Sequence, residues 1–163
     1  MQYMSSQIRR HHLNALGARI LDLGGRNVNG TPRHLFNRAA MYVSVDLQEG
    51  RDVDIVADAA DLNLDDRFDV VVSTELFEHT ARADEIVGAA CRHLVAGGVF
   101  LATMAGPGRA PHGASGEQRP PRGEWYCNIE PGALEGWLRA AGFGWWNVNQ
   151  LGTDLRCHAR TAE

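Results

Sequence analysis

The sequence predicts an α/β fold: a doubly wound, mostly parallel, seven-stranded sheet with helices on both faces and a C-terminal antiparallel hairpin. Strand-sized apolar runs alternate with segments long enough for a helix, as parallel strands joined by crossover connections require. Residues 68–73 have the near-continuous branched apolar content of a strand covered on both faces. A length of 163 residues with 44% hydrophobic content suits a single domain over residues 1–163 with its own core.

The expected strands are apolar runs bounded by turn residues or by helical segments. The first four end before residue 74, and most of them lead into an acidic or hydroxyl side chain. The last two flank Gly152, which suits the turn of a hairpin. In chain order, strands are expected at residues 19–23, 41–45, 53–57, 68–73 and 99–104, followed by hairpin strands at 143–149 and 154–159.

Start and stop signals place the helices between these strands. Gly17 ends an N-terminal helical segment within residues 1–18. Thr31 and Pro32 form an N-cap and a first-turn proline. Pro131 opens a later helix, which Gly142 closes. Helices are therefore expected at residues 6–16, 31–37, 82–94 and 131–141.

Composition and charge exclude several classes of protein. Sixteen basic and 20 acidic side chains give a formal net charge of -4, which argues against a long nucleic acid as partner. The apolar stretches are too short to cross a membrane and no signal peptide is recognisable, so a cytoplasmic location is expected. Cys91, Cys127 and Cys157 show no metal-like or redox spacing. Neither a disulfide framework nor a metal site is therefore expected.

Residues 106–128 interrupt the alternation of strands and helices. They are rich in Gly, Pro, Arg and His, and a loop of this length is usually a lid or a disordered segment. Trp125 and Tyr126 would come near the carboxyl ends of the fourth and fifth strands, where they could wall an acceptor pocket or anchor the loop to the core. Trp145 and Trp146 alternate faces on a strand, so one is exposed unless a partner covers it, which favours a homodimer.

Polar side chains stand at the carboxyl ends of four predicted strands. Asp22, Asp46 and Asp58 each close an apolar run, and Ser73 closes the fourth strand. Ligands of parallel sheets bind at the carboxyl ends of the strands, beside the point where strand order reverses. The pattern therefore predicts one shared crevice, whose carboxylates suit a ligand with an ammonium group and a ribose.

From about Arg19 to Met104 the chain resembles the class I methyltransferases that use S-adenosylmethionine. Asp22-Leu23-Gly24 is similar to the start of that family's first motif, whose glycine loop lets the backbone approach the methionine part of the cofactor. Asp46 follows Asp22 by 24 positions and matches the acid that accepts hydrogen bonds from both ribose hydroxyls. The resemblance implies a Rossmann-like fold and S-adenosylmethionine as cofactor.

The same resemblance implies roles for the later segments. Leu47 would lie against the adenine, and Asp58-Ala59 would contact its amino group and ring edge. Ser73-Thr74-Glu75, with Glu78-His79, resembles the family's segment after the fourth strand. The implied cofactor-binding residues are Asp22, Gly24, Gly25, Asn29, Asp46, Leu47, Asp58, Ala59, Ser73 and Glu75.

The glycine loop departs from the family's motif at Arg26 and Val28, where further glycines are usual. The turn must be built differently, with Asn29-Gly30 supplying left-handed backbone. Some methyltransferases of this fold carry such a loop, so the resemblance implies a variant loop.

Three functional hypotheses remain open at this point. The first is a methyltransferase for an unidentified small-molecule or protein acceptor. The second is a nicotinamide-dependent oxidoreductase, although the chain lacks its Gly-x-Gly-x-x-Gly pattern and a catalytic domain. The third is a non-catalytic module that keeps the cofactor crevice.

A methyltransferase with a hydroxyl or ammonium acceptor must remove a proton. His79 and His112 are the candidate catalytic residues, because an imidazole titrates near neutral pH. A helix-start pair satisfied by backbone groups is the simpler interpretation of Glu78-His79. A loop residue without a partner is the simpler interpretation of His112.

Overall fold

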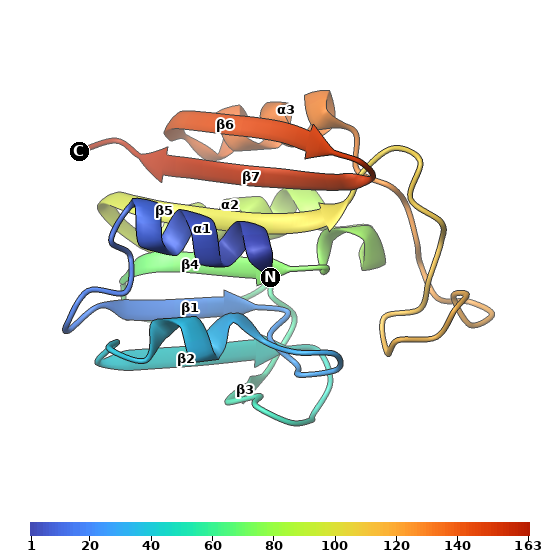
Figure 1. Ribbon diagram of the computed structural model, residues 1–163, viewed down its shortest axis with the longest axis horizontal. Coiled ribbons are helices and arrows are strands. Elements are labelled where there is room, and N and C mark those ends of the chain that lie inside the picture. The colour runs from blue at the N-terminus through green and yellow to red at the C-terminus, as the bar shows by residue number, and fades with distance from the viewer.

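The computed structural model describes residues 1–163 and contains one seven-stranded sheet with helices on both faces (Figure 1). The strand order is β3-β2-β1-β4-β5-β7-β6, and β7 alone runs opposite to the other six strands. The chain runs outward from β1 to β3 and then crosses back to β4, so strand order reverses between β1 and β4. The strands are β1 (Arg19–Leu23), β2 (Met41–Asp46), β3 (Ile55–Val56), β4 (Phe68–Thr74), β5 (Leu94–Ala105), β6 (Phe143–Leu151) and β7 (Asp154–Thr161).

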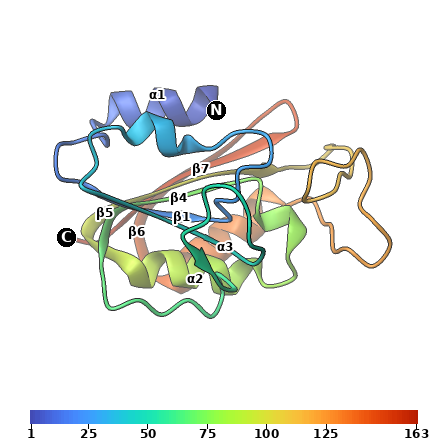
Figure 2. The same ribbon diagram turned by 90° about the horizontal axis from the view of Figure 1, so that it is seen from below.

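Helices cover the two faces of the sheet, as Figure 2 shows. On one face lie α1 and the short 3₁₀ helix η1, over a core of ten buried residues that includes Met4, Ile8 and Ile20. On the other face lie α2 and α3, over a core of 24 buried residues. The helical segments are α1 (Gln2–Arg10), η1 (Pro32–Phe36), η2 (Phe77–His79), α2 (Ala83–His93) and α3 (Pro131–Ala141).

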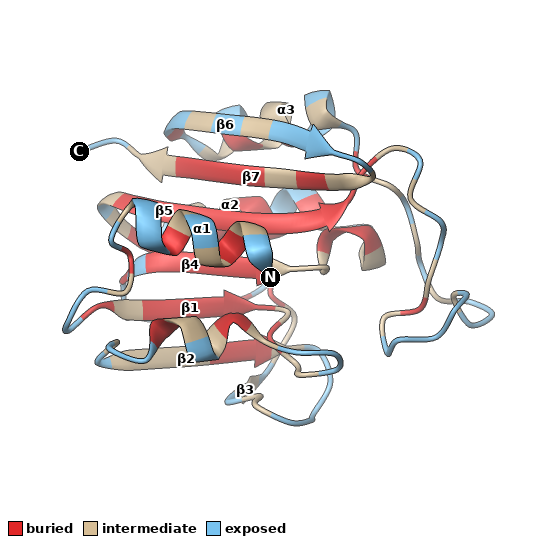
Figure 3. Cartoon of the chain, in the orientation of Figure 1, coloured by how far each residue is buried: buried red, intermediate tan, exposed pale blue.

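The central strands are the most buried part of the molecule, as Figure 3 shows. In β4 the apolar residues alternate between the two cores: Val70 and Val72 face the α1 side, whereas Phe68 and Val71 face the α2 side. This explains why the run is almost continuously apolar, since neither face meets water. The predicted fold class is confirmed.

Several boundaries differ from the sequence-based expectation. The first helix spans Gln2–Arg10 rather than residues 6–16, because Met4 and Ile8, four positions apart, are its buried side chains. Leu16, which suggested a later helix, is 81% exposed. His12 has a φ of 55°, which ends the helical run.

Three further elements also depart from the prediction. The third strand keeps only Ile55–Val56 of residues 53–57, because β2 offers partners to these two alone at the edge of the sheet. The expected 31–37 helix is the 3₁₀ helix η1, capped by the Thr31 hydroxyl, which accepts from the Arg33 backbone amide. The fifth strand starts at Leu94, which pairs with Phe68 before a bulge. The hairpin and α3 lie where they were expected.

None of the helices is both long and apolar enough to cross a membrane. The three cysteines carry free thiols, and Cys157 is fully buried in β7. Trp145 is half-exposed, whereas Trp146 packs against the larger core. The predicted alternation of these two rings is therefore correct.

Candidate functional site

The predicted site residues gather at the carboxyl ends of β1, β2 and β4, beside the reversal of strand order. Residues 106–128 contain no helix or strand and lie at the same end of the sheet, to the right of the strands in Figure 1. Two hydrogen bonds are among the contacts that join this segment to the glycine loop and to η2. The Arg26 guanidinium donates to Ser115 Oγ over 2.9 Å, and the Cys127 amide donates to the Glu78 carbonyl over 2.9 Å. We call residues 106–128 the lid.

Asp22 is the most buried of the predicted cofactor-binding acids, with no exposed surface. Its Oδ2 accepts a hydrogen bond from the Tyr42 hydroxyl over 2.6 Å, whereas Oδ1 has no partner. Burial raises the pKa of Asp22 to about 7, although the Tyr42 hydrogen bond and nearby Arg33 oppose that shift. A cation brought beside this carboxyl would favour its ionised form.

The glycine turn after β1 packs directly on this carboxyl. A Cβ at Gly25 would collide with Ser44 Oγ and lie 2.9 Å from Asp22 Cγ. Gly24 adopts a φ of 75°, and its amide donates to the Val45 carbonyl over 2.8 Å. Only glycines therefore allow the backbone to approach the two strands so closely.

Asp46 ends β2 and links the glycine loop to the turn that follows β2. Its Oδ2 accepts from the Arg26 amide over 3.2 Å, and its Oδ1 accepts from the Gln48 amide over 3.0 Å. Each carboxylate oxygen keeps a further lone pair for a hydroxyl donor. Leu47, beside it, is 69% exposed, so an apolar side chain stands open next to the acid.

Asp58 lies two residues after β3 and is occupied by neighbours within the protein. Its Oδ1 accepts from the Ala60 amide over 2.9 Å, and its Oδ2 pairs with Arg82 over 2.7 Å. Arg82 also pairs with Asp61 and Glu85. Ala59 is buried in the larger core.

The remaining predicted residues at this rim differ in what they offer a ligand. The Ser73 hydroxyl is buried and donates to the Leu23 carbonyl over 2.8 Å, which ties β4 to β1. Glu75 has a φ of 55°, a strained conformation for a residue with a side chain, and pairs with Arg109 over 3.3 Å. Asn29 is exposed and lies against the lid, since a Cβ at Gly116 would be 3.2 Å from Asn29 Nδ2.

A second buried carboxyl, Glu78, lies on η2, shortly after the carboxyl end of β4. It has no exposed surface; its Oε1 accepts from the Ala105 amide over 3.1 Å, and its Oε2 has no partner. Burial, followed by the negative charge of Glu75, raises the pKa of Glu78 to about 8. After the ligands expected from the sequence, we call the region around Glu78 the acceptor end and the region around Asp22 the cofactor end.

Two histidines and a tyrosine surround Glu78. The rings of His79 and His112 lie edge to face at 5.0 Å, and that of Tyr126 lies 5.5 Å from His79 and 5.2 Å from His112. His112 Nε2 lies 4.0 Å from Glu78 Oε1. Burial, followed by the neighbouring His112, lowers the pKa of His79, so its imidazole is neutral at pH 7.

The structure thus brings both predicted catalytic histidines and Tyr126 together. Trp125 is 52% exposed and takes no part in these ring contacts. Sequence reasoning did not identify Tyr42 and Ser44 as neighbours of Asp22, although Ser44 pairs with Asp22 in the β1–β2 register. Glu124, whose Oε1 lies 3.5 Å from His79 Nδ1, had no signal in the sequence.

Two open grooves, of about 670 and 440 Å³, lie at the opposite end of the strands. The first is lined by α1, the turn after it and η1, and the second by that turn and the start of β5. Neither contains a predicted site residue.

Comparisons with known proteins point to one family. A family model described as a methyltransferase domain matches residues 2–148. No match was found among curated proteins.

Solved structures of methyltransferases share the fold. A Burkholderia thailandensis 1,6-didemethyltoxoflavin-N1-methyltransferase, with its substrate and S-adenosylhomocysteine bound, is 17% identical with a TM-score of 0.72, over 99% of this chain and 77% of that one. An S-adenosylmethionine-dependent methyltransferase from Mesorhizobium loti is 19% identical with a TM-score of 0.70, over 95% of this chain and 96% of that one. A Haemonchus contortus phosphoethanolamine N-methyltransferase 2, bound to phosphomonomethylethanolamine and S-adenosylhomocysteine, is 16% identical with a TM-score of 0.70. The match covers 99% of this chain and 53% of that one.

Proposed function

We propose that this chain, which belongs to the methyltransferase domain family, binds S-adenosylmethionine across the carboxyl ends of β1, β2 and β3. Membership of that family makes the chain a methyltransferase, as the sequence predicted.

One observation carries the proposal: three acids from neighbouring strands stand along one rim around a glycine turn. Asp22, with an unpartnered oxygen, suits the ammonium of the methionine part. Asp46, with free lone pairs on both oxygens, suits the two ribose hydroxyls. Asp58 would contact the adenine amino group, and Leu47 and Ala59 would lie beside the adenine ring. Because Asp58 already pairs with Arg82, we expect its contribution to be the smallest of the three.

The same charges argue against a nicotinamide cofactor. A dinucleotide would bring its pyrophosphate to the glycine turn. There the anionic phosphates would meet the Asp22 carboxyl, and like charges repel at this range. A methyl donor brings an ammonium and a sulfonium instead, and both attract carboxylates.

In the proposed reaction a lone pair of the acceptor forms a bond to the methyl carbon while the carbon–sulfur bond breaks. That electron pair stays on sulfur, which gives S-adenosylhomocysteine. The protein contributes mainly positioning and the exclusion of water under the lid, and positioning is worth up to roughly 7–11 kcal/mol in favourable systems. If the acceptor is a hydroxyl or an ammonium, a neutral imidazole, His79 or His112, accepts its proton.

We propose a small molecule, or a side chain of a protein, as the acceptor. The two neighbouring enzymes with bound substrates act on small molecules, and this chain's net charge of -4 does not favour nucleic acid. Tyr126 would line the acceptor pocket; Trp125, also expected there, would have to turn inward. A cytoplasmic location and a homodimer formed through the exposed Trp145 complete the proposal.

Calorimetric titration with S-adenosylmethionine and with NADH tests the cofactor. We expect the first to bind and the second not to bind. Asp46→Ala should lose most of the affinity, because each hydrogen bond to a charged group contributes about 1.5–3 kcal/mol. Asp65→Ala is the matched control, since Asp65 is exposed and forms no ion pair. Equal affinities in the two variants would contradict the role of Asp46.

Release of S-adenosylhomocysteine tests for turnover. Across a panel of hydroxyl, amine and thiol acceptors, a methyltransferase gives acceptor-dependent release. Tight cofactor binding without release for any acceptor would favour the non-catalytic module instead.

A further inference from the structure

We propose that Glu78, His79 and His112 form a binding site for a divalent transition-metal ion, with Zn²⁺ as the reference ion, at the acceptor end of the crevice. The site itself rests on the geometry of these three side chains. Its use in methyl transfer rests on the function proposed above.

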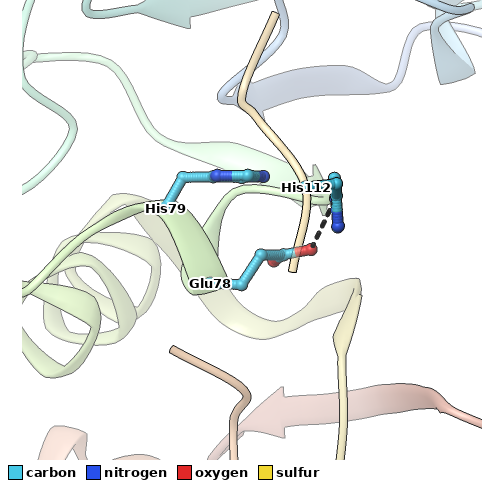
Figure 4. A group of neighbouring side chains, drawn as sticks. All are labelled: Glu78, His79 and His112. Carbon is cyan, nitrogen blue, oxygen red and sulfur yellow. Dashed lines mark ion pairs between the residues drawn. The ribbon is translucent and has the colours of Figure 1, made fainter. Parts of the chain in front are cut away.

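The three side chains come from two segments that are distant in the sequence (Figure 4). Glu78 and His79 belong to η2, whereas His112 belongs to the lid. One ligand atom from each side chain lies within 4.8 Å of the other two, and Glu78 Oε1 is 4.0 Å from His112 Nε2. Figure 4 shows the three groups directed toward one common space.

Two of these side chains each contain one buried atom without a hydrogen-bond partner. Glu78 Oε2 is removed from solvent in a residue with no exposed surface. His79 Nδ1 is also removed from solvent, in a side chain that is 8% exposed. It lies 3.5 Å from Glu124 Oε1 without the geometry of a hydrogen bond. Buried polar atoms normally have a partner, so orphan atoms on two neighbouring members of this cluster point to a missing ligand.

The chemistry of the three groups fits a transition metal better than a hard cation. Two imidazoles with one carboxylate are the protein ligands of many open zinc sites, whereas Mg²⁺ and Ca²⁺ prefer oxygen ligands. Tetrahedral bonds of about 2.0–2.2 Å require ligand atoms roughly 3.3–3.6 Å apart. The lid would therefore have to carry His112 about an ångström closer. Because His112 lies on a segment without regular structure, that movement breaks no helix or strand.

Nearby charges also favour a cation at this position. Glu75, beside Glu78, is partly neutralised by Arg109, whereas Glu124, beside His79, has no arginine partner. Glu124 accepts only the Ala114 amide over 2.7 Å, so it stands ready as a fourth ligand or as an acceptor for a bound water. Such outer partners orient the ligands of a metal site.

An open coordination position on the ion would let the site bind the methyl acceptor. An acceptor hydroxyl or thiol bound to the ion would have a lowered pKa, and its proton would leave to water before the methyl group is transferred. The imidazoles would then hold the ion rather than accept the proton. The acceptor would accordingly be a molecule with an oxygen or sulfur that can ligate the ion.

The test measures Zn²⁺ affinity in chelator-treated, tag-free protein by competition with a chromophoric chelator. We expect one ion per chain in the wild type. His112→Gln and Glu78→Gln should each weaken binding by about 100-fold or more, because loss of an outer partner alone costs about 10–100-fold. His34→Gln is the matched control, since it removes an exposed imidazole from η1. Co²⁺ in place of Zn²⁺ should give visible absorption typical of nitrogen and oxygen ligation, and His112→Gln should alter it.

Equal Zn²⁺ affinity in His112→Gln, Glu78→Gln and His34→Gln would overturn the proposal, as would a wild type that binds no ion. Glu78→Gln keeps an acceptor for the Ala105 amide, and His112 lies on the lid, so both variants should fold. Calorimetry with S-adenosylmethionine on the same samples separates the two proposals. Cofactor binding without metal binding removes only the metal site. Failure of the wild type to bind the cofactor removes the proposed function, whatever the metal result.

Discussion

The cofactor end and the acceptor end of the crevice each contain a buried carboxyl, but they are built differently. Asp22 lies inside β1, paired in register with Ser44 of β2, and the Tyr42 hydroxyl holds one of its oxygens. Glu78 lies on the three-residue helix η2 and faces His112 of the lid, 34 positions later. Burial raises the pKa of both carboxyls, to about 7 and about 8.

This difference separates what the sheet determines from what the loops determine. Strand register fixes Asp22, so the cofactor end is preorganised before any ligand arrives. The acceptor end is complete only when the lid lies against η2. A rigid cofactor end with a lid-dependent acceptor end suits an enzyme that keeps one cofactor while its acceptor is set by the lid.

The largest expected effect concerns the stability of the acceptor end. Folded protein keeps the Glu78 proton up to about pH 8, whereas the unfolded chain releases it near 4.5. The folded state therefore holds more protons between these values, and stability falls as pH rises through them. In chelator-treated Glu78→Gln this fall should shrink. Between pH 5 and pH 8.5 the free energy of unfolding should therefore fall by at least about 2 kcal/mol more in wild type than in the variant.

Urea unfolding of both proteins at several pH values measures this difference. Asp65→Asn, which changes an exposed acid, should leave the pH slope unchanged. A slope in Glu78→Gln that equals the wild-type slope would show that the acceptor end is open to water.

The next effect concerns the cofactor end and is about tenfold. A carboxyl with a pKa near 7 must lose its proton before it attracts the methionine ammonium. Affinity for S-adenosylmethionine should therefore rise by about tenfold from pH 6 to pH 8 in wild type, relative to Asp22→Asn. The amino group of the ligand titrates equally with both proteins and cancels in this ratio. The groups that face Asp22 are Tyr42, Arg33, Asp46 and Asp54.

Calorimetry in buffers of different ionisation enthalpy provides a second measurement. Wild type should release a proton on binding at pH 6.5, and Asp22→Asn should release less. The same pH profile in both proteins would mean that the ammonium lies away from Asp22, and the comparison between the two carboxyls would lose its functional meaning.

The two ends also differ in how far the sequence could predict them. Asp46 was recognisable because an apolar run of strand length ends there, and parallel strands place their carboxyl ends together. Tyr42 was not recognisable as the partner of Asp22, because sequence periodicity does not set the register of neighbouring strands. The grouping of Glu78 with His112 follows from the path of a loop without periodic pattern, and such a path depends on turn geometry and tertiary contacts.

The N-terminal segment shows the same limit within a regular element. Leu13 and Leu16 suggested a helix to residue 16. Leu13 is instead buried in the loop after α1, and Leu16 is exposed. Helical spacing indicated that apolar side chains are near one another; it did not indicate which backbone brings them there. The strands β1, β2 and β4, whose signal is a continuous apolar run, were placed more accurately than this helix.

The smallest expected effect concerns Arg26, which links the two ends. Its amide donates to Asp46, while its guanidinium donates to Ser115 of the lid over 2.9 Å. Arg26→Ala keeps the amide and removes the guanidinium, which contacts Ser115 of the lid and also lies 3.9 Å from Asp46 Oδ1. One hydrogen bond contributes about 0.5–1.5 kcal/mol, so amide hydrogen exchange in residues 106–128 should accelerate about 2- to 12-fold. Arg122→Ala, within the lid, is the matched control, because the Arg122 side chain is exposed and forms no ion pair or hydrogen bond. If exchange in the lid is the same in both variants, the lid is held at the acceptor end alone, and the cofactor end has no part in closing it.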